Sequence, residues 1–150
     1  MKLLITVMLA SCLGVAQAGE VLDFEFVDAN GHQYRTATLA DDLARYNWPS
    51  DEITPIKILL IETPSLKDAR YKKQSSILTS LGHHDNLGLF YVVACPNEEF
   101  AFGYHTSKLV AKTLAGSMTV FRIRLLDQRG GVLHESLEPI SADALRKWNR

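Results

Sequence analysis

The chain has 150 residues, a length that suits one domain and is short for two ordinary ones. Its formal net charge is −1, and charges of both signs are interspersed without a basic stripe, so we expect no nucleic-acid partner. The apolar fraction of 47% is ample for a packed core and argues against disorder.

The first eighteen residues, MKLLITVMLASCLGVAQA, predict a signal peptide. Lys2 precedes an apolar run, and Ala16-Gln17-Ala18 has the small residues that signal peptidase accepts. The run is too short to anchor the chain stably across a bilayer of about 30 Å. We therefore expect cleavage before Gly19, a periplasmic or secreted mature protein, and no transmembrane segment in it. The alternative is a lipoprotein signal, Leu9-Ala10-Ser11-Cys12, in which Cys12 becomes the lipidated N-terminus.

Cleavage before Gly19 would leave Cys95 as the only thiol, which rules out an internal disulfide and a dithiol cycle within the mature chain. Cys95 follows the apolar run LGLFYVVA, and this position predicts a small core residue at the end of a buried strand. The alternatives are a one-cysteine peroxidatic thiol and an intermolecular disulfide. A reactive thiol needs partial exposure and a cationic neighbour, whereas Glu98 and Glu99 follow Cys95 closely.

The mature chain opens with a predicted β-hairpin and a short helix. Apolar and polar side chains alternate over residues 22–26, which predicts a half-buried strand. A turn that contains Asn-Gly separates this strand from a return strand at 33–37. Thr38, with Asp41 three residues on, predicts the cap of a helix at 39–46.

The next segment predicts a strand–helix–strand unit. Residues 56–62, IKILLIE, form a nearly continuous apolar run, which is typical of a central parallel strand covered on both faces. Ser65 and Asp68 have the spacing of a capping box for a helix that ends near Gly82. A second apolar run at 87–95 predicts a strand parallel to the first, because strand, helix and strand in this order form a βαβ unit.

The C-terminal third adds a helix, a hairpin and a last helix. The predicted bounds are a helix at 107–116, strands at 118–126 and 132–137 around a tight turn at 127–131, and a helix at 142–149 capped by Ser141. A βαβ half joined through a helix to a ββα half is the layout of the thioredoxin fold.

We therefore predict a thioredoxin-like three-layer α/β/α domain with a mixed central sheet and an N-terminal β-hairpin extension. The predicted divisions are a signal peptide at 1–18, the hairpin and short-helix extension at 19–55, and the thioredoxin-like domain at 56–150.

The segments ILLIETPSLKDARYKKQ, LFYVVAC and VFRIRLLDQRGGVLHESLEPISADAL resemble domain-of-unknown-function family 4174. The matching residues are Leu60, Thr63, Pro64, Ser65, Asp68, Tyr71 and Gln74, followed by the hairpin from Asp127 to Gly131. The resemblance covers the chain from about Ile56 to Trp148. It implies a thioredoxin-like fold, an exported bacterial location, relatives in animal extracellular matrix proteins and no established enzymatic activity.

This chain departs from the family pattern at one point. The family often has a basic residue soon after a tryptophan that precedes the first core strand. Here Trp48 is separated from Lys57 by PSDEITPI, which leaves the N-terminal edge of the domain undefined.

The first candidate site is the strand-to-helix junction, where a thioredoxin would carry its Cys-x-x-Cys pair. Because the residues here are Thr63-Pro64-Ser65-Leu66, thiol chemistry is lost, although a helix N-terminus is still able to bind an anion. The alternative is that Ser65 and Asp68 only cap the helix. The loop at 117–119 should lie beside the junction, and it lacks the cis-proline with which thioredoxins bind substrate backbone. The predicted groove residues are Thr63, Pro64, Ser65, Asp68, Gln74, Ser117, Met118 and Thr119.

Two further groups of polar residues are candidate ligand sites. Arg122 and Arg124 share one strand face and would suit a carboxylate or sulfate; the alternative is an exposed face paired with acids such as Glu135. His83-His84-Asp85 has some metal-ligand character, but adjacent histidines in a turn rarely converge on a metal, and no second pair has ligand spacing. We expect no catalytic residue, no metal and no cofactor.

These observations favour an exported, non-redox thioredoxin-fold module that binds an unknown protein or small molecule in the cell envelope. One alternative is a one-cysteine thiol-peroxidase-like enzyme that uses Cys95. Another is a small-anion or metal binder at the helix N-terminus or at His83-His84-Asp85.

Overall fold

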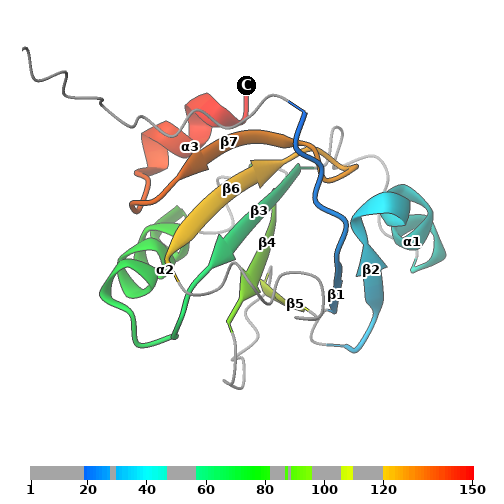
Figure 1. Cartoon of the computed structure of the whole chain (residues 1–150), viewed down its shortest axis with the longest axis horizontal. Helices are drawn as coiled ribbons and strands as arrows, with labels where there is room; N and C mark the ends of the chain where they lie inside the picture. The colour runs from blue at the N-terminus through cyan, green and yellow to red at the C-terminus, as the bar shows by residue number, and fades with distance from the viewer. Residues whose placement is uncertain are drawn as a thin grey trace, which may run out of the picture.

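The computed structural model describes residues 19–27, 30–46, 57–81, 87, 89–95, 106–109 and 120–150. The elements in chain order are β1 (Glu25–Val27), β2 (Gln33–Arg35), the 3-10 turn η1 (Thr36–Thr38), α1 (Leu39–Arg45), β3 (Lys57–Glu62), α2 (Ala69–Leu81), β4 (Leu89–Ala94), β5 (Thr106–Leu109), β6 (Arg122–Leu126), β7 (Val132–Ser136) and α3 (Ala142–Trp148) (Figure 1). No helix in these ranges is long and apolar enough to span a membrane.

The described strands form one mixed sheet in the order β2-β1-β5-β4-β3-β6-β7. β3 pairs in parallel with β4, with Leu60 opposite Val92, which confirms the predicted βαβ unit. β6 runs antiparallel to both β3 and β7. The N-terminal hairpin extends the same sheet, because β1 pairs with β5.

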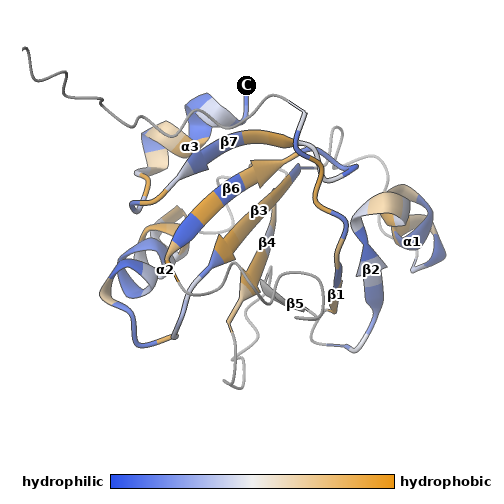
Figure 2. Ribbon diagram, in the orientation of Figure 1, coloured by the Kyte–Doolittle hydropathy of each residue, from blue (hydrophilic) through white to orange (hydrophobic). Residues whose placement is uncertain are grey.

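Side chains of β3 alternate between two cores, because successive residues of a strand point to opposite faces. Ile58 and Leu60 pack with aromatic residues of the N-terminal hairpin and with Leu39 of α1. Leu59 and Ile61 pack on the other face, which α2 and α3 cover (Figure 1). The resulting layers are helix, sheet and helix. Figure 2 shows the apolar colouring running along β3 and β4, while β6 carries hydrophilic breaks.

The helix predicted at 107–116 is wrong over its first three residues. Ser107, Lys108 and Leu109 belong to β5, and Ser107 lies opposite Val92 of β4 in a parallel pair. Pairing with the exposed edge of β4 outweighs the modest helix preference of this short segment, because tertiary context overrides propensity. Residues 110–116 lie outside the described residues.

The predicted cap of α1 by Thr38 with Asp41 is wrong. Thr38 stands at the N-cap position, but its side chain caps no N–H group of the helix. Its hydroxyl instead donates to Asp42 Oδ2 at 3.0 Å. Asp42 is buried and also accepts a hydrogen bond from the Arg35 N–H at 3.0 Å. Residues 36–38 form the 3-10 turn, so β2 ends at Arg35, two residues earlier than predicted.

The turn between β6 and β7 holds the start of the described chain. Asp127 Oδ1 accepts hydrogen bonds from the N–H groups of Arg129 at 2.8 Å and Gly131 at 2.9 Å. Gly130 has a φ of +86°, and a Cβ at this residue would lie 2.1 Å from the Leu22 carbonyl oxygen. Leu22 N–H donates to the Gly130 carbonyl at 2.9 Å. Glycine is therefore required both by the backbone conformation and by the close approach of the N-terminal segment.

Candidate functional site

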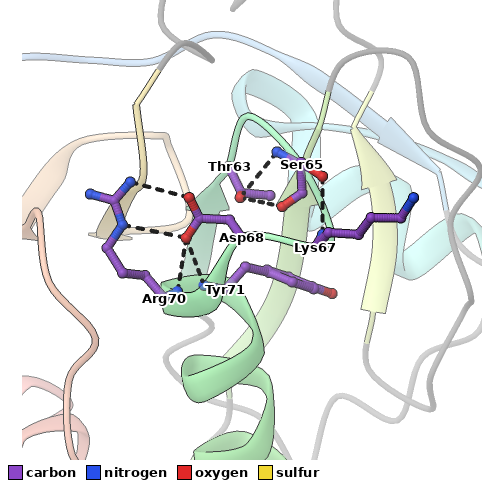
Figure 3. A network of polar contacts seen from close by, with 6 residues as sticks. All are labelled: Thr63, Ser65, Lys67, Asp68, Arg70 and Tyr71. Atoms are coloured by element: carbon purple, nitrogen blue, oxygen red, sulfur yellow. Dashed lines mark hydrogen bonds and ion pairs between the residues drawn. The ribbon is translucent and has the colours of Figure 1, made fainter.

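The β3–α2 junction begins at Thr63, which is fully buried directly after β3. Its N–H donates to the Ala94 carbonyl at 2.9 Å and so ties the junction to the end of β4. Its hydroxyl donates to the Ser65 carbonyl at 2.8 Å and accepts from the Ser65 N–H at 3.4 Å (Figure 3). The Thr63 hydroxyl thus holds the loop and is not exposed to a ligand.

Ser65 belongs to a turn that precedes the helix. Its hydroxyl oxygen accepts from the Lys67 N–H at 3.0 Å, and its carbonyl accepts from the Asp68 N–H at 3.1 Å (Figure 3). α2 starts only at Ala69, so Ser65 is too far upstream to cap it. The predicted capping box of Ser65 with Asp68 is therefore wrong, although both residues do hold the junction in shape.

Asp68 is the residue whose side chain caps α2. Its Oδ1 accepts hydrogen bonds from the N–H groups of Arg70 at 2.8 Å and Tyr71 at 3.4 Å. The Arg70 guanidinium pairs with Asp68 Oδ2 at 3.2 Å (Figure 3). The hydrogen bond from the Arg70 side chain, followed by the backbone hydrogen bonds, lowers the pKa of Asp68. The N-terminus of α2 already holds a carboxylate of its own chain, which agrees with the capping alternative and leaves little room for an outside anion.

Gln74 lies between α2 and the segment that leads into α3. It is fully buried, and its Oε1 accepts a hydrogen bond from the Ile140 N–H at 2.8 Å. Its Nε2 is buried without a hydrogen-bond partner. Gln74 therefore does not line an exposed groove. Its hydrogen bond joins α2 to the segment that precedes α3.

Several predicted residues cannot be placed. Ser117, Met118 and Thr119, the other wall of the predicted groove, lie outside the described residues, as do His83, His84 and Asp85. Across the ranges that are described, no group of three or more His, Cys, Asp or Glu residues is arranged to hold a metal ion.

Pro64 and Ser65 are partly exposed at the junction, and a separate depression lies along α2. This depression has a volume of about 540 Å³, and its lining residues are Tyr71, Lys72, Ser75, Ser76, Thr79 and Ser80.

Arg124 forms a buried ion pair with Glu62. Its Nε lies 3.0 Å from Glu62 Oε2, and its Nη2 lies 2.9 Å from Oε1 and 2.7 Å from Oε2. Arg124 is 2% exposed and Glu62 is fully buried, and Arg124 Nη1 also reaches Glu20 Oε1 at 3.3 Å. The prediction that Arg124 lies on an exposed face with Glu135 is wrong, because a nearer carboxylate on β3 takes its guanidinium.

Glu62 is a site residue that the sequence patterns did not single out. Its signal in the sequence is a lone acid at the end of the apolar run IKILLIE. A buried charge needs a partner, so this position required a cation on a neighbouring strand. Which cation it takes depends on the pairing of β3 with β6, where Leu60 lies opposite Arg124 and Glu62 opposite Arg122.

Arg122 is the other predicted anion contact, and within the described residues it has no acidic partner. It is partly exposed, and its Nε is buried without a hydrogen bond. Of the two predicted arginines, only Arg122 is therefore available to a ligand.

Cys95 is buried, 6% exposed, at the end of β4, and it forms no disulfide within the described residues. This confirms the prediction of a small core residue. Cys95 lies beside the β3–α2 junction, because Ala94, the residue before Cys95, accepts a hydrogen bond from the Thr63 N–H.

No protein-family model matches the sequence, and no curated protein matches it either. Solved structures do match. Peroxidoxin BcpB from Mycobacterium tuberculosis is 17% identical, with a TM-score of 0.57 over 87% of this chain and 93% of that chain. StoA from Bacillus subtilis is 12% identical, with a TM-score of 0.55 over 87% and 98% of the two chains.

A putative thiol:disulfide interchange protein DsbE from Chlorobium tepidum is 15% identical, with a TM-score of 0.53 over 89% of this chain and 95% of that chain. The fold is thioredoxin-like. At these identities the likeness establishes the fold and leaves the activity to the site itself.

Proposed function

We propose that this chain is a non-catalytic binding module of the bacterial cell envelope, exported by the signal peptide at residues 1–18 and belonging to domain-of-unknown-function family 4174. The observation that carries the proposal is the β3–α2 junction. In a thioredoxin the redox pair would sit there, and this thioredoxin-like chain has Thr63, Pro64, Ser65 and Leu66. The Thr63 hydroxyl donates to the Ser65 carbonyl and the Ser65 hydroxyl accepts from the Lys67 N–H, so both hydroxyls help to hold the loop.

The burial of Cys95 favours a binding role over a thiol enzyme. A thiolate nucleophile needs access to its substrate and a cationic neighbour. Cys95 is 6% exposed and lies in the core at the end of β4. The partly exposed residues of the junction, Pro64 and Ser65, are available for contact with a partner.

Site-specific crosslinking in the native envelope tests the proposal. A photo-crosslinking residue replaces Lys67, which is exposed at the junction, and a matched control replaces Ala40, which is exposed on α1. We expect a discrete adduct from residue 67 and none from residue 40, and we expect the adduct to persist in Cys95→Ser. An absent adduct at residue 67, or peroxide turnover that Cys95→Ser abolishes, would contradict the proposal.

A further inference from the structure

Arg122 lies opposite Glu62, whose carboxylate is already paired with Arg124. It opens β6, and its Cα lies opposite that of Glu62 on β3. Alternation places Arg122 on the same face as Arg124 and Leu126, and Leu126 packs in the core with Leu60. Arg124 occupies both oxygens of the Glu62 carboxylate, at 2.7 to 3.0 Å. Among the described residues, Arg122 is thereby left as an unpaired cation at the carboxyl end of β3.

One hydrogen-bond donor of Arg122, its Nε, is unmet within the described residues. A guanidinium has five N–H donors and no acceptor. In the described part of the chain, Arg122 makes no ion pair, and its Nε is buried without a partner. Native proteins rarely leave a buried donor unsatisfied, so such a group calls for an acceptor from outside the chain, such as a water, an ion or a ligand. The side chain is nevertheless partly exposed, so a ligand has access to it.

Two exposed apolar residues flank Arg122 and indicate the kind of ligand. Ser136 at the end of β7 lies opposite Ile123, so the next residue, Leu137, comes beside Arg122. Leu137 is 53% exposed, and Val120, two residues before Arg122, is 44% exposed. An oxyanion alone would gain nothing from these side chains, whereas an aliphatic carboxylate would bury them and pair with the guanidinium through its planar fork.

Two other charges among the described residues lie on this face. Glu20 pairs with Arg124 at 3.3 Å. Glu135 on β7 lies opposite Arg124 and, within the described residues, forms no ion pair with Arg122 or Arg124. Glu135 is therefore the acid that opposes an incoming anion, and it supplies a control of opposite sign.

We propose that Arg122, flanked by Leu137 and Val120, binds a ligand that carries a carboxylate next to an apolar group. The source is either a small organic acid or the C-terminus of a peptide that ends in an apolar residue. This inference rests on the proposed function, since it names the chemistry of a ligand that binds at the same end of the sheet, where β3 leads into the junction.

The test follows the Arg122 Nε–Hε signal by NMR in the ¹⁵N-labelled mature chain. Hexanoate represents the organic acid, N-acetyl-leucine the peptide terminus, and hexanamide a neutral molecule of similar shape. At least one of the two acids should shift the Arg122 signal, and the acid that binds identifies the source. The signal of Arg129, which is exposed on the β6–β7 turn, should stay in place. An Arg122 signal that neither acid moves, or that hexanamide moves equally, overturns the inference.

Variants make the result specific. Arg122→Gln should weaken the binding of the acid about tenfold, because it removes charged hydrogen bonds. Leu137→Ser should reduce the preference for hexanoate over acetate, and Glu135→Gln should strengthen binding because it removes a repelling charge. Unchanged affinity in Arg122→Gln, with the fold intact by circular dichroism, also overturns the inference.

The crosslinking experiment separates this inference from the proposed function. If the residue 67 adduct forms and persists in Arg122→Gln while neither acid binds, the ligand chemistry is wrong and the binding module stands. If the wild-type adduct is missing, the proposed function itself fails, and the inference that rests on it fails with it.

Discussion

Glu62 and Arg124 form a buried bidentate ion pair between the central strands β3 and β6, with a shortest distance of 2.7 Å between Oε2 and Nη2. Both side chains are buried, and Glu62 is the last residue of β3, directly before the β3–α2 junction. Desolvation of two charges opposes this arrangement, so the pair is weak evidence for net stability. Because both charges are buried, the loss of either one would leave the other without its main partner.

Removing one partner of this pair should be costly. We expect Glu62→Gln to lower the free energy of unfolding by about 3–5 kcal/mol, because Arg124 would remain charged and buried with the exposed Glu20 as its one acidic partner among the described residues. Chemical denaturation measures the change. The double variant Glu62→Leu with Arg124→Leu should lose less than the single variant, and a single variant as stable as the wild type would contradict the buried pair.

The pH dependence of stability should report the cap of α2. The pKa of Asp68 is lowered in the folded protein, so its contribution is present above the pKa of an unfolded aspartate, about 3.9. The contribution is lost as the pH falls through the lower folded pKa. We expect Asp68→Ala to cost about 0.5–2 kcal/mol at neutral pH, the usual range for a cap.

Unfolding curves of the wild type and Asp68→Ala across this pH range provide the measurement. The difference between the two proteins should shrink in acid, because protonation removes the charge that the variant also lacks. A difference that stays constant from neutral pH to strong acid would show that the Asp68 carboxylate is not what holds the N-terminus of α2.

The contact between Gln74 and Ile140 should be a structural one. Gln74→Met leaves the Ile140 N–H buried without an acceptor, which we expect to cost about 1–3 kcal/mol. The Ile140 amide should also exchange its hydrogen faster. Ser76→Ala changes an exposed residue on the same helix and should have little effect. If Gln74→Met weakened ligand binding and spared stability, Gln74 would belong to the binding site after all.

Alanine substitutions at Gly130 and Gly31 distinguish the cost of close packing from the cost of backbone strain. Both have a positive φ, +86° and +81°, so alanine at either residue should cost roughly 1–2 kcal/mol. Only at Gly130 does the new Cβ meet another segment, 2.1 Å from the Leu22 carbonyl oxygen. We therefore expect Gly130→Ala to be clearly the more destabilising of the two by chemical denaturation. Equal losses would mean that residues 20–22 do not dock on the β6–β7 turn.

Long apolar runs made most of the sheet predictable. The runs around β3 and β4 are nearly continuous and lie between turn sequences, so hydrophobic burial defines them, whereas β6 was predicted with Arg122 and Arg124 on one face. The Asp127 turn was predictable for a similar reason, since its glycines suit few other conformations.

Two of the failures, at β5 and at Arg124, share a physical cause, which is that the deciding partner is distant in sequence. β5 forms at 106–109 because β4 offers an edge, and no local pattern records that edge. Ser65 and Asp68 both have side chains that suit a helix start, and the turn at 65–68 selected Asp68. The ion pair of Arg124 depended on how β6 pairs with β3, which brings its guanidinium to the carboxylate of Glu62.

Crosslinking at residue 67, compared with residue 40, directly tests whether the β3–α2 junction binds a partner. We expect a discrete adduct in the native envelope from a photo-crosslinking residue at position 67, beside the partly exposed Pro64 and Ser65, and none from position 40 on α1. No adduct at position 67, or equal labelling at both positions, would contradict a binding role for the β3–α2 junction.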